Sequence, residues 1–295
     1  MNERRMGRVI LILLILLNLI LFGYYLYQQL NESWVPKERI EQVKELYQKS
    51  GIWIQAEPEQ RNQSYPILEL GEANLDQMVK DVLIEPYEKM YIYGSKVQYI
   101  SEQAVIVTDR KEHTISYQAQ ERQTEVTLQR EVSVEEWARQ QRITTEEAED
   151  LMEKQATDFA HKWMGDDINL SKVEKTNEGY QYSFHAMRDE MVLYFNELQV
   201  CVYLGEVLSA ELTYWEVTGE ANNTPVLLPI DEILYAMLGD IRTELKEGEK
   251  DEVVKIMDGY QIEESEEIEK PAKAVPAIMV VMKSGREYVM NRTTL

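Results

Sequence analysis

The segment that most constrains this chain is an uninterrupted apolar run near its N-terminus. Residues Val9–Tyr27 read VILILLILLNLILFGYYLY and contain no charged side chain. At about 1.5 Å of rise per residue, this run would form roughly 28 Å of helix, close to the ~30 Å hydrocarbon thickness of a bilayer. A helix of a soluble domain is usually apolar on one face only, so a run that is apolar all round predicts a transmembrane helix.

The flanking residues predict the orientation of this helix. Residues 1–8 carry three arginines against one glutamate, and short basic flanks tend to stay in the cytoplasm. Aromatic side chains, which prefer the headgroup level, gather at the other end of the run. They are Tyr24, Tyr25, Tyr27 and Trp34. We therefore expect residues 1–8 to be a cytoplasmic tail, residues 9–27 to span the membrane, and the remainder to lie outside the cell.

A cleaved secretory signal is the alternative interpretation of the same run. Its basic start fits a signal, but its apolar core exceeds the ~7–15 residues that are typical of one. Bulky Tyr, Gln and Leu side chains follow the run where a cleavage site needs small residues. The sequence therefore favours a retained anchor.

The chain beyond this run is strongly acidic. The whole sequence has 53 Asp and Glu against 31 Lys and Arg, which gives a net charge of −22. Such a surface repels phosphate backbones, so we expect no nucleic-acid partner. The single cysteine, Cys201, lies in an apolar strand-like run and is predicted to be a buried core thiol. Because secreted domains from disulfide-forming compartments usually carry paired cysteines, a bacterial exterior is favoured over a eukaryotic glycoprotein, despite five N-x-S/T triplets.

Hydrophobic periodicity divides the outer region into two parts. In the first part, a helical pattern runs from Pro36 to Gly51, and β-branched and aromatic runs between residues 90 and 128 predict an antiparallel meander. Ser133 with Glu136, and Thr144 with Glu147, have capping-box spacing and predict two helix starts. In the second helix, one face is predicted to consist of Met152, Gln155, Phe159 and Trp163.

The second part, like the first, is predicted to contain helices that lead into antiparallel strands. Alternating patterns between residues 180 and 215 predict strands with one buried and one wet face, and Pro229 opens another helix. A strand over 251–262 and a hairpin over 277–290 close the chain. The predicted fold class is α+β, with one N-terminal transmembrane helix followed by two helix-plus-antiparallel-sheet extracytoplasmic subdomains, residues 33–141 and 142–295.

The sequence contains no catalytic signature. It has neither G-x-S-x-G nor S-x-x-K, and no Gly-rich phosphate loop. Of the three histidines, His113 is expected to be solvated and His161 and His185 to be packed, with no H-E-x-x-H among them. We expect no catalytic, cofactor-binding or metal-binding residue, and no cofactor or small-molecule ligand. Because the two carboxylates of a glycosidase are paired in space, the many acidic residues leave an anchored cell-wall-processing enzyme as an alternative.

One polar side chain interrupts the apolar run. Asn18 lies near its middle, and Gly23 follows five residues later. An amide in lipid gains from an interhelical hydrogen bond of about 1–2 kcal/mol, and a glycine lets another backbone approach. Asn18 and Gly23 are therefore the candidates for a transmembrane interaction, although Asn18 could also point into lipid or bond to its own helix.

Several segments resemble the YycI (WalI) family, which regulates the cell-wall two-component system of low-GC Gram-positive bacteria. They are the basic start, I-L-L-N-L-I-L-F, K-S-G-I-W-I, L-P-I-D-E-I-L-Y-A-M-L, D-G-Y and V-P-A-I-M-V-V-M-K-S-G-R-E-Y-V-M-N. The resemblance implies a non-catalytic, membrane-anchored protein that modulates the sensor histidine kinase together with a YycH-like partner. A PepSY-like anchored protease inhibitor or modulator is an alternative, because it would share the closing helix and hairpin.

If the apolar run is an interaction surface, removing its amide should weaken an association. We predict that Asn18→Leu lowers the recovery of a membrane partner when the tagged chain is purified from membranes. Recovery equal to that of the parent chain would contradict this role.

Overall fold

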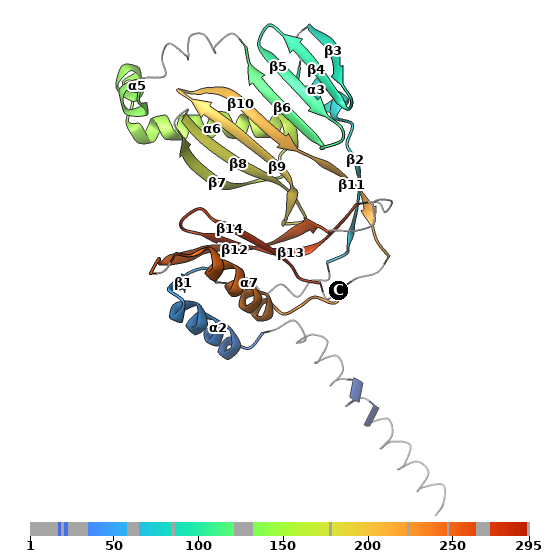
Figure 1. Ribbon diagram of the computed structural model, residues 1–295, viewed down its shortest axis with the longest axis vertical. Coiled ribbons are helices and arrows are strands. Elements are labelled where there is room, and N and C mark those ends of the chain that lie inside the picture. Colours follow the sequence, from blue (N-terminus) through green and yellow to red (C-terminus); the bar gives the residue numbers. More distant parts are fainter. Residues whose placement is uncertain are drawn as a thin grey trace, which may run out of the picture. The chain divides into compact units, whose positions relative to one another are not determined.

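The computed structural model describes residues 17–18, 21–22, 35–57, 65–83, 86–120, 132–176, 179–222, 225–246, 248–263 and 272–293. It divides into two compact units, whose helices and strands carry labels in Figure 1. The first unit comprises Met1–Tyr65, Val226–Ile256 and Val280–Leu295, and the second comprises Pro66–Pro225 and Met257–Met279. The predicted boundary near Gln141 lies within the second unit.

The first unit contains two helices beside a small group of strands. They are α2 (Lys37–Lys49), β1 (Ile52–Ile54), α7 (Ile230–Glu244), the start of β12 (Asp251–Ile262), the end of β13 (Lys273–Met282) and β14 (Glu287–Asn291). The two helices are joined by the Tyr47 hydroxyl, which donates to the Leu234 carbonyl at 2.7 Å, and by an Arg39–Asp231 ion pair at 2.6 Å. Strand β1 pairs in parallel with β12, from Ile52 opposite Asp251.

The second unit is built on a broad sheet. Its strands are β2 (Leu68–Glu72), β3 (Tyr87–Tyr93), β4 (Lys96–Ser101), β5 (Ala104–Asp109), β6 (Thr114–Ala119), β7 (Ile168–Thr176), β8 (Gly179–Arg188), β9 (Met191–Tyr203), β10 (Glu206–Thr213), β11 (Trp215–Glu220) and the remaining parts of β12 and β13. Its helices are α3 (Leu75–Val82), α5 (Val134–Gln141) and α6 (Thr145–Met164). From β9 the order runs through β10, β6, β5 and β4 to β3, while β8 and β7 extend it on the other side.

Helix α6 packs on one face of this sheet, against β8, β9 and β10 (Figure 1). Thr144 caps it with a complete capping box, in which Glu147 bonds back to the Thr144 backbone at 2.7 Å. Its fully buried side chains recur every fourth residue, which places them on one stripe of the helix. They are Ala148, Met152, Ala156 and Ala160. Small side chains along this stripe let the helix axis come close to the sheet.

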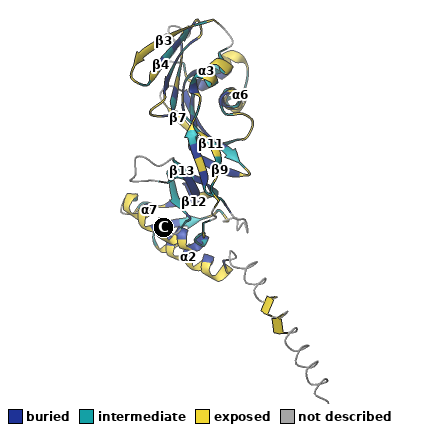
Figure 2. Ribbon diagram, turned by 90° about the vertical axis from the view of Figure 1, so that its right-hand side faces the viewer, coloured by how far each residue is buried: buried dark blue, intermediate teal, exposed yellow. Residues whose placement is uncertain are grey.

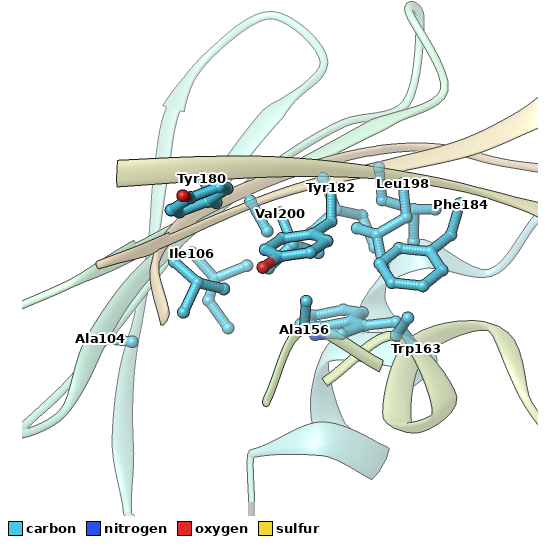
Figure 3. Packing of buried hydrophobic residues seen from close by; sticks show 14 of the residues in the cluster. Ala104, Ile106, Ala156, Trp163, Tyr180, Tyr182, Phe184, Leu198 and Val200 are labelled. Carbon is cyan, nitrogen blue, oxygen red and sulfur yellow. The ribbon is translucent and has the colours of Figure 1, made fainter. Parts of the chain in front are cut away.

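The sheet supplies the large side chains of this core. Figure 3 shows Tyr182 and Phe184 of β8 and Leu198 of β9 on the side of the sheet that Trp163 and Ala156 of α6 cover. At roughly 25 cal/mol per Å² of apolar surface, each buried aromatic ring is worth a few kcal/mol of stability. The core is therefore one-sided, with aromatic and aliphatic residues of the strands facing alanines of the helix.

The predicted fold class is wrong. The sheet is mixed, because β12 pairs in parallel with β9, at Gly259 opposite Val192, as well as with β1. Parallel neighbours are joined by long connections, and periodicity carries no information about which strands pair. Among the described residues, no helix has both the length and the apolar character to cross a membrane. The predicted helix of residues 9–27 lies outside the described residues, apart from the helical positions 17, 18, 21 and 22.

Most individual elements of the described chain match their predictions. The predicted helix starts at Ser133 and Thr144 are confirmed, with a complete capping box at Thr144 and a Ser133 side chain that accepts from the Glu136 backbone. The antiparallel meander from β3 to β6 is also confirmed. The predicted strand over 124–128 lies outside the described residues. The predicted buried face of α6 is wrong in part, because Gln155 is exposed and the alanines take its place. Strand β7 was not predicted.

The alanine stripe leads to a prediction about stability. Ala156→Leu should lower the free energy of unfolding by about 1–3 kcal/mol, because its extra methyl groups have no space between α6 and the sheet. Urea unfolding followed by tryptophan fluorescence measures this change. Lys154→Leu, on the exposed side of the same helix, is the control and should stay within about 0.5 kcal/mol of the parent. Equal stability of the two variants would mean that this contact is not tight.

Candidate interaction surface

The face of the sheet opposite α6 is polar. Because side chains alternate along a strand, the residues between the core positions of β8, β9, β10 and β6 all lie on this second face. They are Gln181, Gln199, Cys201, Ser209, Glu211, Ser116 and Gln118, together with Ser183, which is buried. The strand register places them in continuous rows, such as Gln181, Cys201, Ser209 and Gln118. We call this set the open face.

Hydrogen bonds fix several side chains of the open face. The Gln181 amide donates to the Gln199 carbonyl oxygen at 2.7 Å, and the Gln199 amide donates to Glu197 at 2.9 Å. Gln118 donates to the Leu208 backbone carbonyl at 3.2 Å. Such bonds hold the rotamers of long amide side chains, so the face presents a fixed pattern of donors and acceptors.

The open face is hollowed where the four strands meet. A shallow depression of about 270 Å³ is lined by Gln181, Gln199, Cys201, Ser209 and Glu211, among others. Its groups are amides, hydroxyls, a thiol and one carboxylate. The arrangement can bind a polar surface by hydrogen bonds.

A second hollow lies on the α6 side of the unit. It measures about 390 Å³, and Tyr117 of β6 and Phe159 of α6 form its aromatic floor, with ring centroids 5.0 Å apart. Asp158 and Lys162 add one charge of each sign at its rim. This hollow is the exposed end of the core, whereas the open face extends over four strands.

A bulge in β9 ends the open face. Between His185 and Ala186 of β8 the register shifts, because Tyr194, Phe195 and Asn196 are extra residues on β9. The Asn196 side chain bonds the backbone of Trp215 twice, accepting at 2.7 Å and donating at 3.0 Å. The bulge thereby ties β9 to the start of β11. It also explains why the sequence pattern predicts two short strands, residues 192–195 and 199–204, where the chain forms the single strand β9.

Two of the three histidines occupy environments other than those predicted. His185 is buried, as predicted, with its ring edge-on to Tyr194. His113 is also buried rather than solvated, since its ring stacks on Trp215 at 3.6 Å between centroids. The prediction for His161 is wrong, because its side chain is partly exposed beside the Gly165 carbonyl.

The structure describes one of the two sequence-predicted interaction residues. Asn18 is helical and exposed, and Gly23 lies outside the described residues. Cys201, predicted to be a buried core thiol, is instead partly exposed on the open face. In the sequence, the alternation of Gln, Ser and Glu with apolar residues indicates a polar face on each strand. Only the strand order shows that the polar faces of four strands lie side by side. Within the described part of the chain, no group of three His, Cys, Asp or Glu side chains could hold a metal ion.

Comparisons with known proteins assign no family. No protein-family model matches the chain, and no curated protein matches it. Among solved structures, the chain is similar to an uncharacterized protein from Eubacterium rectale, with 11% identity, a TM-score of 0.42, and coverage of 79% of this chain and 82% of that one. It is also similar to the Bacillus megaterium YpeB C-terminal domain, with 11% identity, a TM-score of 0.36, and coverage of 77% and 95%.

The buried His185 predicts acid sensitivity. Burial lowers the pKa of its imidazole, against the opposing influence of the Glu197 carboxylate and the Asn196 backbone. Since the folded state binds this proton more weakly than the unfolded chain, stability should fall as pH drops below the unfolded pKa of about 6.5. In His185→Phe this loss should be smaller, as measured by urea unfolding between pH 8 and pH 5.5. The difference in unfolding free energy between the parent and His185→Phe at pH 8 reports packing alone. The same difference at pH 5.5 would contradict the prediction.

Proposed function

We propose that this chain is a non-catalytic regulatory protein at the cell membrane of a Gram-positive bacterium. It would modulate a cell-wall-sensing histidine kinase together with a YycH-like partner. Membrane association is supported by the apolar run of residues 9–27 and its basic flank. The choice of partners is supported by the resemblance of both chain ends to the YycI family.

The observation that carries the proposal is the open face. It extends over four strands, its side chains are mostly neutral donors and acceptors, and the aromatic core behind it keeps it in place. Protein interfaces of this polar type bind through many hydrogen bonds around a hydrophobic centre. Here the aliphatic side chains of Val105 and Val107 on β5 continue the rows of Gln118 and Ser116. A partner surface would therefore meet both polar and apolar groups.

Charge substitutions on the open face test this proposal. The double variant Gln118→Arg/Gln181→Arg should lower co-purification of the kinase and the YycH-like protein from membranes by more than about tenfold. An unpaired charge at a closed interface costs more than the 1.4 kcal/mol that corresponds to tenfold weaker binding. Gln48→Arg, on the exposed side of α2, is the matched control and should leave recovery unchanged.

The alternative functions, a PepSY-like modulator and an anchored enzyme, predict different results for the purified chain. If the double variant recovers both partners as well as the parent chain does, the open face is not the surface that binds them. Inhibition of a protease by the purified chain, with no effect on kinase phosphorylation, would favour a PepSY-like modulator. Turnover of cell-wall fragments would favour the anchored enzyme.

A further inference from the structure

The edge strand β3 exposes a continuous run of apolar side chains. The exposed fractions are 50% for Met90, 74% for Tyr91, 50% for Ile92 and 89% for Tyr93. Figure 2 shows β3 in the colour of exposed residues. Among the described strands, β3 pairs with β4 alone and ends the strand order. Its outer edge therefore presents backbone N–H and C=O groups beside four large apolar side chains.

This edge has only part of the usual protection against pairing. Natural edge strands are short, or carry an outward lysine or a proline, or are twisted away by a bulge. Strand β3 has seven residues and no proline. Its lysine, Lys89, is held inward, because it donates to Asp76 at 2.9 Å and lies over the rings of Tyr91 and Tyr99. A bulge lies at the hairpin end of the strand, between Tyr91 and Tyr93, and so within the apolar run.

The charges around β3 differ between its two ends. Glu88 and Glu102 are exposed at the end where Tyr87 pairs with Ser101. Lys96 and Lys111, with exposed side chains, lie at the end where Tyr93 pairs with Lys96, and they contact Asp109 at 3.5 Å and Glu112 at 3.9 Å within the same chain. An antiparallel copy of the same strand would set the carboxylates of one chain near the ammonium groups of the other. The charge pattern is thus partly complementary to itself, because Asp109 and Glu112 also lie at the lysine end.

We propose that β3 is a self-association edge, at which two copies of this chain pair β3 with β3 in antiparallel register about a twofold axis. Centred on the apolar run, this pairing sets Met90 opposite Tyr93 of the partner subunit and Tyr91 opposite Ile92 of the partner subunit. All four exposed apolar side chains then face other apolar side chains. A twofold contact of this kind closes on itself, so it produces a dimer and not a filament. The acidic net charge of each chain opposes association at low salt and is screened at physiological salt.

The mass of the full-length chain in detergent, measured by light scattering after gel filtration, tests the pairing. The parent chain should have the protein mass of a dimer, and Tyr91→Lys/Ile92→Lys should have that of a monomer, since two charges then enter the paired edge. Tyr235→Lys, a charge placed at an exposed tyrosine of α7, is the control and should remain dimeric. A monomeric parent would overturn the proposal, as would a double variant that stays dimeric, which would place the association elsewhere in the chain.

Disulfide trapping tests the register independently. In a Cys201→Ser background the chain has no cysteine, so a single new thiol can link only to its own copy. Tyr91→Cys or Ile92→Cys should give a covalent dimer on mild oxidation, because the axis brings equivalent residues within the ~4.4–6.8 Å Cα separation of a disulfide. Tyr235→Cys should give none. Linkage at Tyr235 alone, or linkage of the β3 thiols to a different protein in membranes, would overturn self-pairing.

Discussion

The close contact between the alanine stripe of α6 and the sheet of the second unit is the constraint on which the other features depend. Ala148, Ala156 and Ala160 bring the helix near the strands, so the large side chains of β8 and β9 fill the space beside it. Because packing inside proteins is dense, the strands must keep one register for these side chains to fit. That register also decides which residues appear on the opposite face.

The open face and the β3 edge are two consequences of this one-sided core. A helix that covers one face leaves the amides and hydroxyls of the other face in water, where an antiparallel region tolerates them. The same sheet ends at β3, which is far along the strand order from α6 and has apolar side chains on its outer part. The open face offers hydrogen bonds from side chains, whereas β3 offers them from the backbone. The two surfaces would therefore recognise partners by different means.

The polar groups inside the second unit serve its geometry. Asn196 bonds both backbone groups of Trp215 and so stabilises the bulge of β9. Asp76 joins α3 to the meander through Lys89, Arg110 and Tyr99, and the bonds from Tyr99 and Lys89 outweigh burial and bring the pKa of Asp76 down to about 2. These bonds are specific and join separate elements, which is typical of polar groups that fix a fold.

The sequence by itself determined the local elements of this protein. Capping residues at Ser133 and Thr144 marked helix starts, and alternation in Tyr180, Tyr182 and Phe184 marked a strand with one buried face, because these signals act over a few residues. Tertiary structure alone decided that the sheet is mixed, that Cys201 lies on the open face, and that His113 is buried against Trp215. Each of these depends on which distant segments become neighbours, and the packing of whole elements sets that choice.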